Sequence, residues 1–204
     1  MLSNMRTVKL SVLPYLLGSI ALAQHAVASA QESKPLANAT ILIIRHAEKP
    51  ADGDGLTPEG EKRAQLYVKF FETYKVDGKQ LHLTHLFAAT DSKKSHRPRL
   101  TIEPLSKALH QSIDLRFTDK EPEKFVSELQ SHSFGKQILV SWRHGEIPSL
   151  LKLLGADAQK LVPEGAWPDN IFDRVIELHF DKDGKVSQSK SKLVFEHLMP
   201  GDEK

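Results

Sequence analysis

The sequence predicts an α/β fold, a three-layer sandwich with a mostly parallel central sheet, helices on both faces and a C-terminal β-hairpin at the sheet edge. Short apolar runs rich in β-branched residues alternate with segments of helical periodicity, the order typical of parallel strands joined by crossover helices. Residues 39–44 and 137–142 have the composition of strands buried on both faces. An Asp-Gly pair at 183–184 separates two segments that alternate apolar and polar residues, which indicates the hairpin.

The expected elements follow from local signals in chain order. After the strand at 39–44 comes a Gly/Asp-rich loop at 51–55. Thr57 is expected to cap the next helix, with Pro58 at its first position. Pro98 must lie in the first turns of the second long helix or kink it. The remaining predicted elements are helix 61–74, strand 81–89, helix 93–109, strand 112–117, helix 122–132, strand 137–142, helix 147–154, and strands 174–181 and 190–197.

Composition limits the class of protein. The 204 residues are 40% hydrophobic and 26% charged, which suits one globular domain with a substantial core. The formal net charge is +2, from 28 Lys and Arg against 26 Asp and Glu. The charge is therefore close to balanced and gives no indication of a nucleic-acid partner. Because the chain has no cysteine, disulfides, thiolate metal sites and a cysteine nucleophile are excluded.

The first thirty residues are predicted to be a signal peptide, which leaves residues 31–204 as the single domain. Arg6 and Lys9 precede an apolar run at 10–23, and the Ala-Ser-Ala sequence that ends at Ala30 fits a signal peptidase site. Cleavage after Ala30 predicts a periplasmic or secreted protein with no stable membrane insertion. Retention of this segment as an uncleaved anchor is the alternative.

Two predicted strands end in the same pair of residue types. Arg45-His46 follows the first strand and Arg143-His144 follows the strand at 137–142. Ligand sites of open α/β sheets lie beyond the carboxyl ends of the strands. Neutral imidazole is a competent nucleophile, and guanidinium groups bind phosphate oxygens. If the two strands are neighbours, the residues Arg45, His46 and His144 suit phosphoryl transfer through a phosphohistidine.

Four segments in order resemble the motifs of the histidine phosphatase superfamily, which includes the phosphoglycerate mutases. The first, Arg-His-Ala-Glu-Lys at 45–49, resembles the family's Arg-His-Gly/Ala-Glu signature, in the sub-branch that has Ala in place of the more common Gly. The others are Leu-Thr-Pro-Glu-Gly at 56–60, the block at 87–91 that continues to Arg97 and Thr101, and His144-Gly145. Together they span over half of the chain, from residue 41 to about residue 154.

The resemblance implies a role for each matching position. His46 is the expected phosphoryl acceptor, Arg45 and Arg97 the phosphate clamp, and His144 the group that completes the pocket. Of these, Arg97 comes from the resemblance alone.

The family's proton donor is not identified by the match. Gly145 replaces the Asp that follows the second histidine in the acid-phosphatase branch. Glu121 and its neighbour Glu123 are candidates from the mutase pattern, and Glu146 is a rival candidate. A donor needs a raised pKa to stay protonated near neutral pH.

The predicted function is therefore hydrolysis of a phosphomonoester, without a cofactor or metal, on a small phosphorylated substrate of unknown identity. The alternatives are a non-catalytic module that binds phosphate or sugar phosphate on the same fold, and a phosphohistidine-protein phosphatase or mutase. Residues 167–173 have two interpretations, a wall of the substrate site or simple packing of Trp167 and Phe172. The oligomeric state is not indicated.

Overall fold

The computed structural model describes residues 34–202. The predicted signal peptide and its cleavage site lie outside these residues. Within the described chain, no helix has the length and apolar character needed to cross a bilayer.

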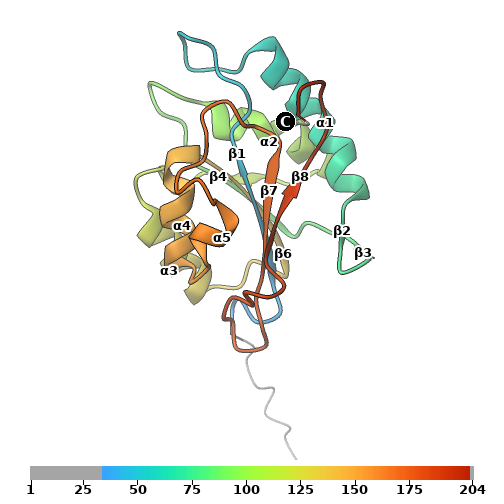
Figure 1. The fold of residues 1–204 in the computed structure, drawn as a ribbon, viewed down its shortest axis with the longest axis vertical. Coiled ribbons are helices and arrows are strands. Elements are labelled where there is room, and N and C mark those ends of the chain that lie inside the picture. Colours follow the sequence, from blue (N-terminus) through green and yellow to red (C-terminus); the bar gives the residue numbers. More distant parts are fainter. Residues whose placement is uncertain (1–33, 203–204) are drawn as a thin grey trace, which may run out of the picture. The chain divides into compact units, whose positions relative to one another are not determined.

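A six-stranded sheet forms the centre of the domain, with strand order β5-β4-β6-β1-β7-β8 (Figure 1). The first four strands in this order run parallel to their neighbours, whereas β7 pairs antiparallel with both β1 and β8. The predicted mostly parallel sheet with a C-terminal hairpin at its edge is confirmed. The strands are β1 (Thr40–Arg45), β4 (His85–Ala88), β5 (Ile113–Asp114), β6 (Gln137–Trp142), β7 (Arg174–His179) and β8 (Lys192–Phe195).

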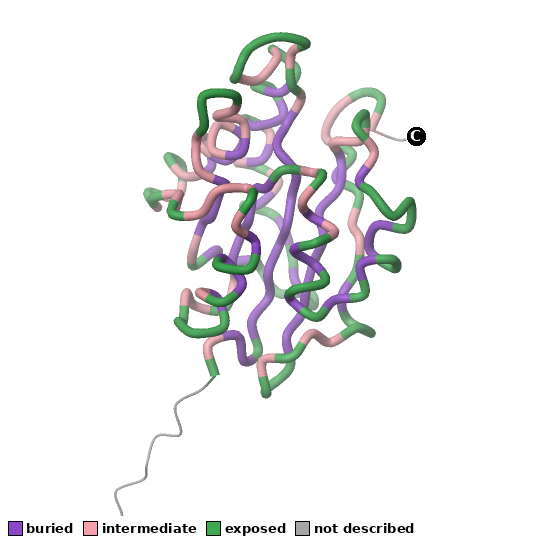
Figure 2. The backbone as a smooth tube through the Cα atoms, turned by 90° about the vertical axis from the view of Figure 1, so that its left-hand side faces the viewer, coloured by how far each residue is buried: buried purple, intermediate pink, exposed green. Residues whose placement is uncertain are grey.

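Helices cover both faces of this sheet, as predicted. Alternate side chains of β1 belong to different cores: Ile41 and Ile43 pack on one face, and Leu42 and Ile44 on the other. The first face is covered by α3, α4 and α5, the second by α1 and α2. Figure 2 shows the strands as a continuous buried centre with exposed segments outside it. The helices are α1 (Pro58–Thr73), α2 (Arg97–Leu109), α3 (Pro122–Ser131), α4 (Ile147–Leu153), α5 (Ala158–Leu161) and the 3₁₀ turn η1 (His144–Glu146).

The start of α1 follows the predicted capping chemistry, and the start of α2 does not follow the predicted boundary. Thr57 accepts a hydrogen bond from the backbone N–H of Gly60, with Pro58 at the first helical position. α2 begins at Arg97 rather than at residue 93. Pro98 lies in the first turn of α2, where its missing N–H costs no helical hydrogen bond.

Residues 75–80 form a small hairpin that the sequence analysis missed. Strands β2 (Lys75–Val76) and β3 (Lys79–Gln80) pair antiparallel across Asp77 and Gly78, both at positive φ. Asp-Gly is the preferred sequence of such a two-residue turn, so the signal was present at 77–78. The predicted strand at 81–89 is shorter than expected, since only β4 joins the sheet.

Gly60 brings the start of α1 against the loop that follows β1. A Cβ atom at this position would lie 2.6 Å from the carbonyl oxygen of Glu48. We therefore expect Gly60→Ala to lower the free energy of unfolding by about 1–3 kcal/mol, the range of overpacking substitutions, as measured by urea denaturation. Gly55→Ala is the matched control, because a Cβ there meets no atom within 4 Å. Equal stability of the two variants would contradict this packing argument.

Candidate active site

The parallel pairing of β1 with β6 brings the two histidines together. Arg45 lies opposite Trp142 in the register of the two strands, so both strands end at the same edge. His46 lies one position beyond the end of β1, and His144 lies two positions beyond the end of β6. The centroids of their rings are 5.6 Å apart, and the ring planes are at 74°. Both rings line a cavity of about 310 Å³, which is at the small end of the range for small-molecule sites.

His46 is held as a neutral imidazole with a defined tautomer. His46 is only 3% exposed, and its Nδ1 lies 2.7 Å from the carbonyl oxygen of Ala47. A carbonyl oxygen can only accept, so Nδ1 carries the proton and Nε2 carries the free electron pair. Burial, followed by the nearby positive charge of Arg45, lowers the pKa of His46 to about 3. The ring is therefore neutral at pH 7, with its proton on Nδ1 and a free electron pair on Nε2.

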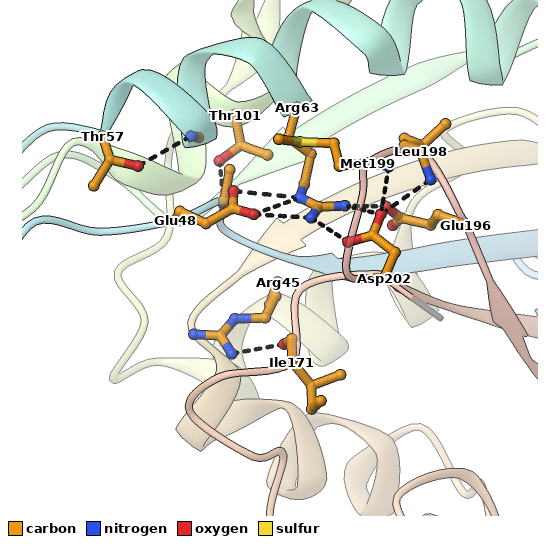
Figure 3. A network of polar contacts seen from close by, with 12 residues as sticks. Arg45, Glu48, Thr57, Arg63, Thr101, Ile171, Glu196, Leu198, Met199 and Asp202 are labelled. Carbon is orange, nitrogen blue, oxygen red and sulfur yellow. Dashed lines mark hydrogen bonds and ion pairs between the residues drawn. The ribbon is translucent and has the colours of Figure 1, made fainter. Parts of the chain in front are cut away.

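Arg45 contacts the loop before β7 and is not among the residues that line the cavity. The residue is 1% exposed. Its Nη1 donates to the carbonyl oxygens of Pro168, Asp169 and Ile171, at 2.9, 3.1 and 2.8 Å. Figure 3 shows the last of these bonds. The structure thus shows Arg45 holding the loop before β7, and its contact with phosphate remains a prediction.

Arg97 does line the cavity, from the first position of α2. Its Nε donates to the carbonyl oxygen of Gly55 at 3.0 Å, and Nη2 donates to that of Gly53 at 2.5 Å. These bonds connect the start of α2 to the loop at 51–55. Burial lowers the pKa of Arg97 from its ordinary value, yet a guanidinium remains charged at neutral pH. A cation is thereby fixed at the cavity wall.

Glu121 and Glu146, two of the predicted proton donors, do not line the cavity. Glu121 accepts from the backbone N–H and hydroxyl of Thr118 and from Lys124, and these bonds lower its pKa to about 2. Glu146 forms an ion pair with Lys120 at 2.7 Å. Neither carboxylate lines the cavity. The geometry therefore does not favour Glu121 or Glu146 as the donor.

Four further charged residues line the cavity, and of these Asp119 was missed by the sequence analysis. Lys49 and Lys94 line the cavity, and so do Arg143 and Asp119, which pair at 3.2 Å. Asp119 is the one carboxylate among the cavity residues of the described chain. It belongs to the loop before α3, where no motif marks it. The cavity wall is consequently dominated by positive charge.

A buried ion network holds the loop behind His46. Arg63 of α1 binds Glu48 from one side at 2.8 Å and Asp202 from the other at 2.7 Å (Figure 3). Glu196 lies 3.4 Å from the same guanidinium and accepts a hydrogen bond from Tyr67 at 2.8 Å. The segment after β8 is therefore connected through Arg63 to Glu48, two positions beyond His46.

This network holds more carboxylates than cations. Glu48, Glu196 and Asp202 share Arg63, and Asp173 lies close enough to raise the pKa of Glu196 further. Burial of Glu196 is the largest cause of this rise. Together with the nearby carboxylates Asp202 and Asp173, it raises the pKa of Glu196 to about 8. Glu196 is therefore mostly protonated at neutral pH, which limits the repulsion among the buried acids.

Comparison with known proteins identifies the fold. No family model matches the sequence, and no curated protein matches it. A putative alpha-ribazole-5'-P phosphatase from Escherichia coli K-12 is similar in structure, with a TM-score of 0.51 and 12% identity over 78% of this chain and 96% of that chain. At this identity the likeness shows the fold alone, and the chain has this α/β fold.

Two phosphoglycerate mutases are also similar in structure. That of Bacillus anthracis has a TM-score of 0.49 and 13% identity, covering 76% of this chain and 92% of its own. That of Plasmodium falciparum has a TM-score of 0.48 and 20% identity, covering 80% of this chain and 98% of its own.

The raised pKa of Glu196 predicts a pH dependence of stability. Because the folded-state pKa lies above the ordinary value of 4.5, the folded state retains a proton that the unfolded state releases. Stability therefore falls as the pH rises from about 5 to 8. We expect Glu196→Gln to reduce this fall by about 1 kcal/mol or more, measured by urea denaturation at pH 5.5 and 8.5. Glu61→Gln, at an exposed position of α1, should leave the fall intact. An unchanged fall in the Glu196 variant would refute the assignment.

Proposed function

We propose that this protein is a phosphomonoester hydrolase that acts through a phosphohistidine on His46. The observation that carries the proposal is the neutral His46, with its free Nε2, in a cavity walled by positive charge. The motif resemblance supports the same chemistry, and the shared α/β fold is compatible with it. The cavity volume favours a small substrate.

The proposed reaction proceeds in two displacements. Nε2 of His46 attacks the phosphorus, the bond from phosphorus to the ester oxygen breaks, and the leaving oxygen takes a proton from the carboxylic acid group of Asp119. Water then attacks the phosphohistidine and gives a proton back to the Asp119 carboxylate, which releases inorganic phosphate and frees the imidazole. Asp119 is the carboxyl group best placed for the proton transfers, since it lines the cavity.

Positive charge at the cavity stabilises the transferring group. Arg97 and Arg143 provide guanidinium groups, and Lys49 and Lys94 provide ammonium groups. Phosphoryl transfer needs positioning and charge neutralisation above all. We propose that this set performs the neutralisation without a metal ion.

We also propose export with cleavage after Ala30, on the basis of the N-terminal sequence pattern. N-terminal sequencing of the protein recovered from the periplasm or the medium tests this proposal, with Gln31 expected as the first residue. Recovery of the intact N-terminus from a membrane fraction would favour the anchor.

The first functional prediction concerns turnover. We expect the mature protein to hydrolyse p-nitrophenyl phosphate in the presence of EDTA, and His46→Ala to reduce kcat/KM by at least about a thousandfold, as expected for loss of a nucleophile. His132→Ala is the control, because His132 is exposed at the C-terminal end of α3 and does not line the cavity, so this variant should retain activity. Tight binding of phosphate without turnover by the wild type would instead support the non-catalytic binding module.

The second functional prediction concerns protonation. Because the pKa of His46 is lowered to about 3, its ring should remain neutral, with the proton on Nδ1, throughout pH 5–8. ¹H–¹⁵N spectra of the histidine side chains measure this directly, with His46→Ala providing the assignment. Titration of the His46 resonances near pH 6.5 would show that the nucleophile is not held as proposed.

A further inference from the structure

The loop before β7 is fixed around a buried cation. Three of its carbonyl oxygens, those of residues 168, 169 and 171, accept from Nη1 of Arg45. The ring of Phe172 covers the same guanidinium, with its centroid 3.9 Å from Cζ. Trp167, itself buried, donates from Nε1 to the carbonyl oxygen of Ile171 at 2.8 Å. Residues 167–172 therefore form a rigid support whose position depends on Arg45.

This support presents Asp169 to His144. The Oδ1 atom of Asp169 lies 2.6 Å from Nε2 of His144, and Nη2 of Arg45 lies 3.3 Å from Nδ1 of the same ring. A guanidinium can only donate, so Nδ1 accepts and the proton of the neutral ring is on Nε2, where it is donated to the carboxylate. Both nitrogens of His144 are thus held by protein groups, and the tautomer is defined.

We propose that Asp169 is a positioning residue that fixes the orientation and tautomer of His144 and supplies its counter-charge. This inference rests on the proposed function, because it assigns His144 a part in phosphoryl transfer. Asp169 does not line the cavity, so its carboxylate does not occupy the space of the substrate. Since Arg45 and Trp167 hold the loop, the carboxylate is a static partner rather than a gate that must open.

The charges around His144 show why a counter-charge is needed. Burial lowers the pKa of the ring, as do the positive charges of Arg45 and Lys49, and His46 lies edge-on beside it. Asp169 is the carboxylate that raises the pKa of His144 against these effects. A carboxylate that holds an imidazole through its N–H group is a general means of supporting histidine in catalysis.

Two substitutions separate orientation from charge. Asp169→Asn retains an acceptor for the Nε2 proton but removes the negative charge, and Asp169→Ala removes both. Asp169 is 80% exposed at its side chain, so neither variant should prevent folding. We expect kcat for p-nitrophenyl phosphate to fall by about tenfold to a hundredfold in Asp169→Ala and by less in Asp169→Asn, with KM changed far less than kcat.

A second measurement does not depend on activity. Side-chain ¹H–¹⁵N spectra should show a lower pKa of His144 in both variants than in the wild type, because the counter-charge is gone. Asn170→Ala, at the next and also exposed position of the loop, is the matched control and should change neither kcat nor the titration of His144.

The outcomes distinguish this inference from its rivals. A rise of kcat/KM in Asp169→Ala would identify Asp169 as a gate and overturn the positioning role. An unchanged His144 titration with unchanged kcat would make Asp169 an ordinary surface carboxylate, and would equally overturn it. Loss of the phosphatase proposal would appear separately, as a wild type that does not turn over while the His144 titration still responds to Asp169.

Discussion

The parallel pairing of β1 with β6 is the constraint on which the site depends. Two neighbouring parallel strands end at the same edge, so whatever follows them in sequence must meet there. The register places the ends of both strands opposite each other, and each is followed within two positions by a histidine. The strands are buried on both faces, so a shift in register would disrupt the packing of side chains in both cores. The same hydrophobic packing that stabilises the sheet therefore fixes the separation of the two imidazoles.

Burial of Arg45 adds a second constraint. A guanidinium removed from water requires acceptors for its donors. Backbone carbonyl groups of the loop before β7 accept from Nη1, whereas Nε has no partner among the described residues. The hydrogen bonds that Arg45 donates to these carbonyl groups also hold the loop in one conformation. A strand end and a loop more than 120 residues apart are thereby joined directly beneath the cavity. Rigid support of this kind is what precise positioning of reactive groups requires.

The sequence predicted those parts of the structure that depend on local signals or on recognisable motifs. The strands at β1 and β6, the cap at Thr57 and the edge hairpin all follow from periodicity, capping chemistry or an Asp-Gly turn. The meeting of His46 with His144 was predicted from topology and the motif resemblance.

Long-range contacts with the backbone were not predictable. The partners of Arg45 are carbonyl oxygens, which every residue has, so no residue type marks them in the sequence. Asp169 was in a segment whose role had two interpretations, and its approach to His144 depends on how the loop wraps around Arg45. Asp119 reaches the cavity wall from an irregular loop, where periodicity gives no information.

The ion network around Arg63 affects when the domain can complete its folding during synthesis. Arg63 holds the loop behind His46 through its ion pair with Glu48. Its second ion pair is with Asp202, which is 139 residues after Arg63 in the sequence. During synthesis His46 and its strand emerge early, yet the guanidinium of Arg63 lacks its full set of carboxylates until residue 202 has left the ribosome. A nascent chain that lacks residue 202 therefore has an incompletely supported loop behind His46.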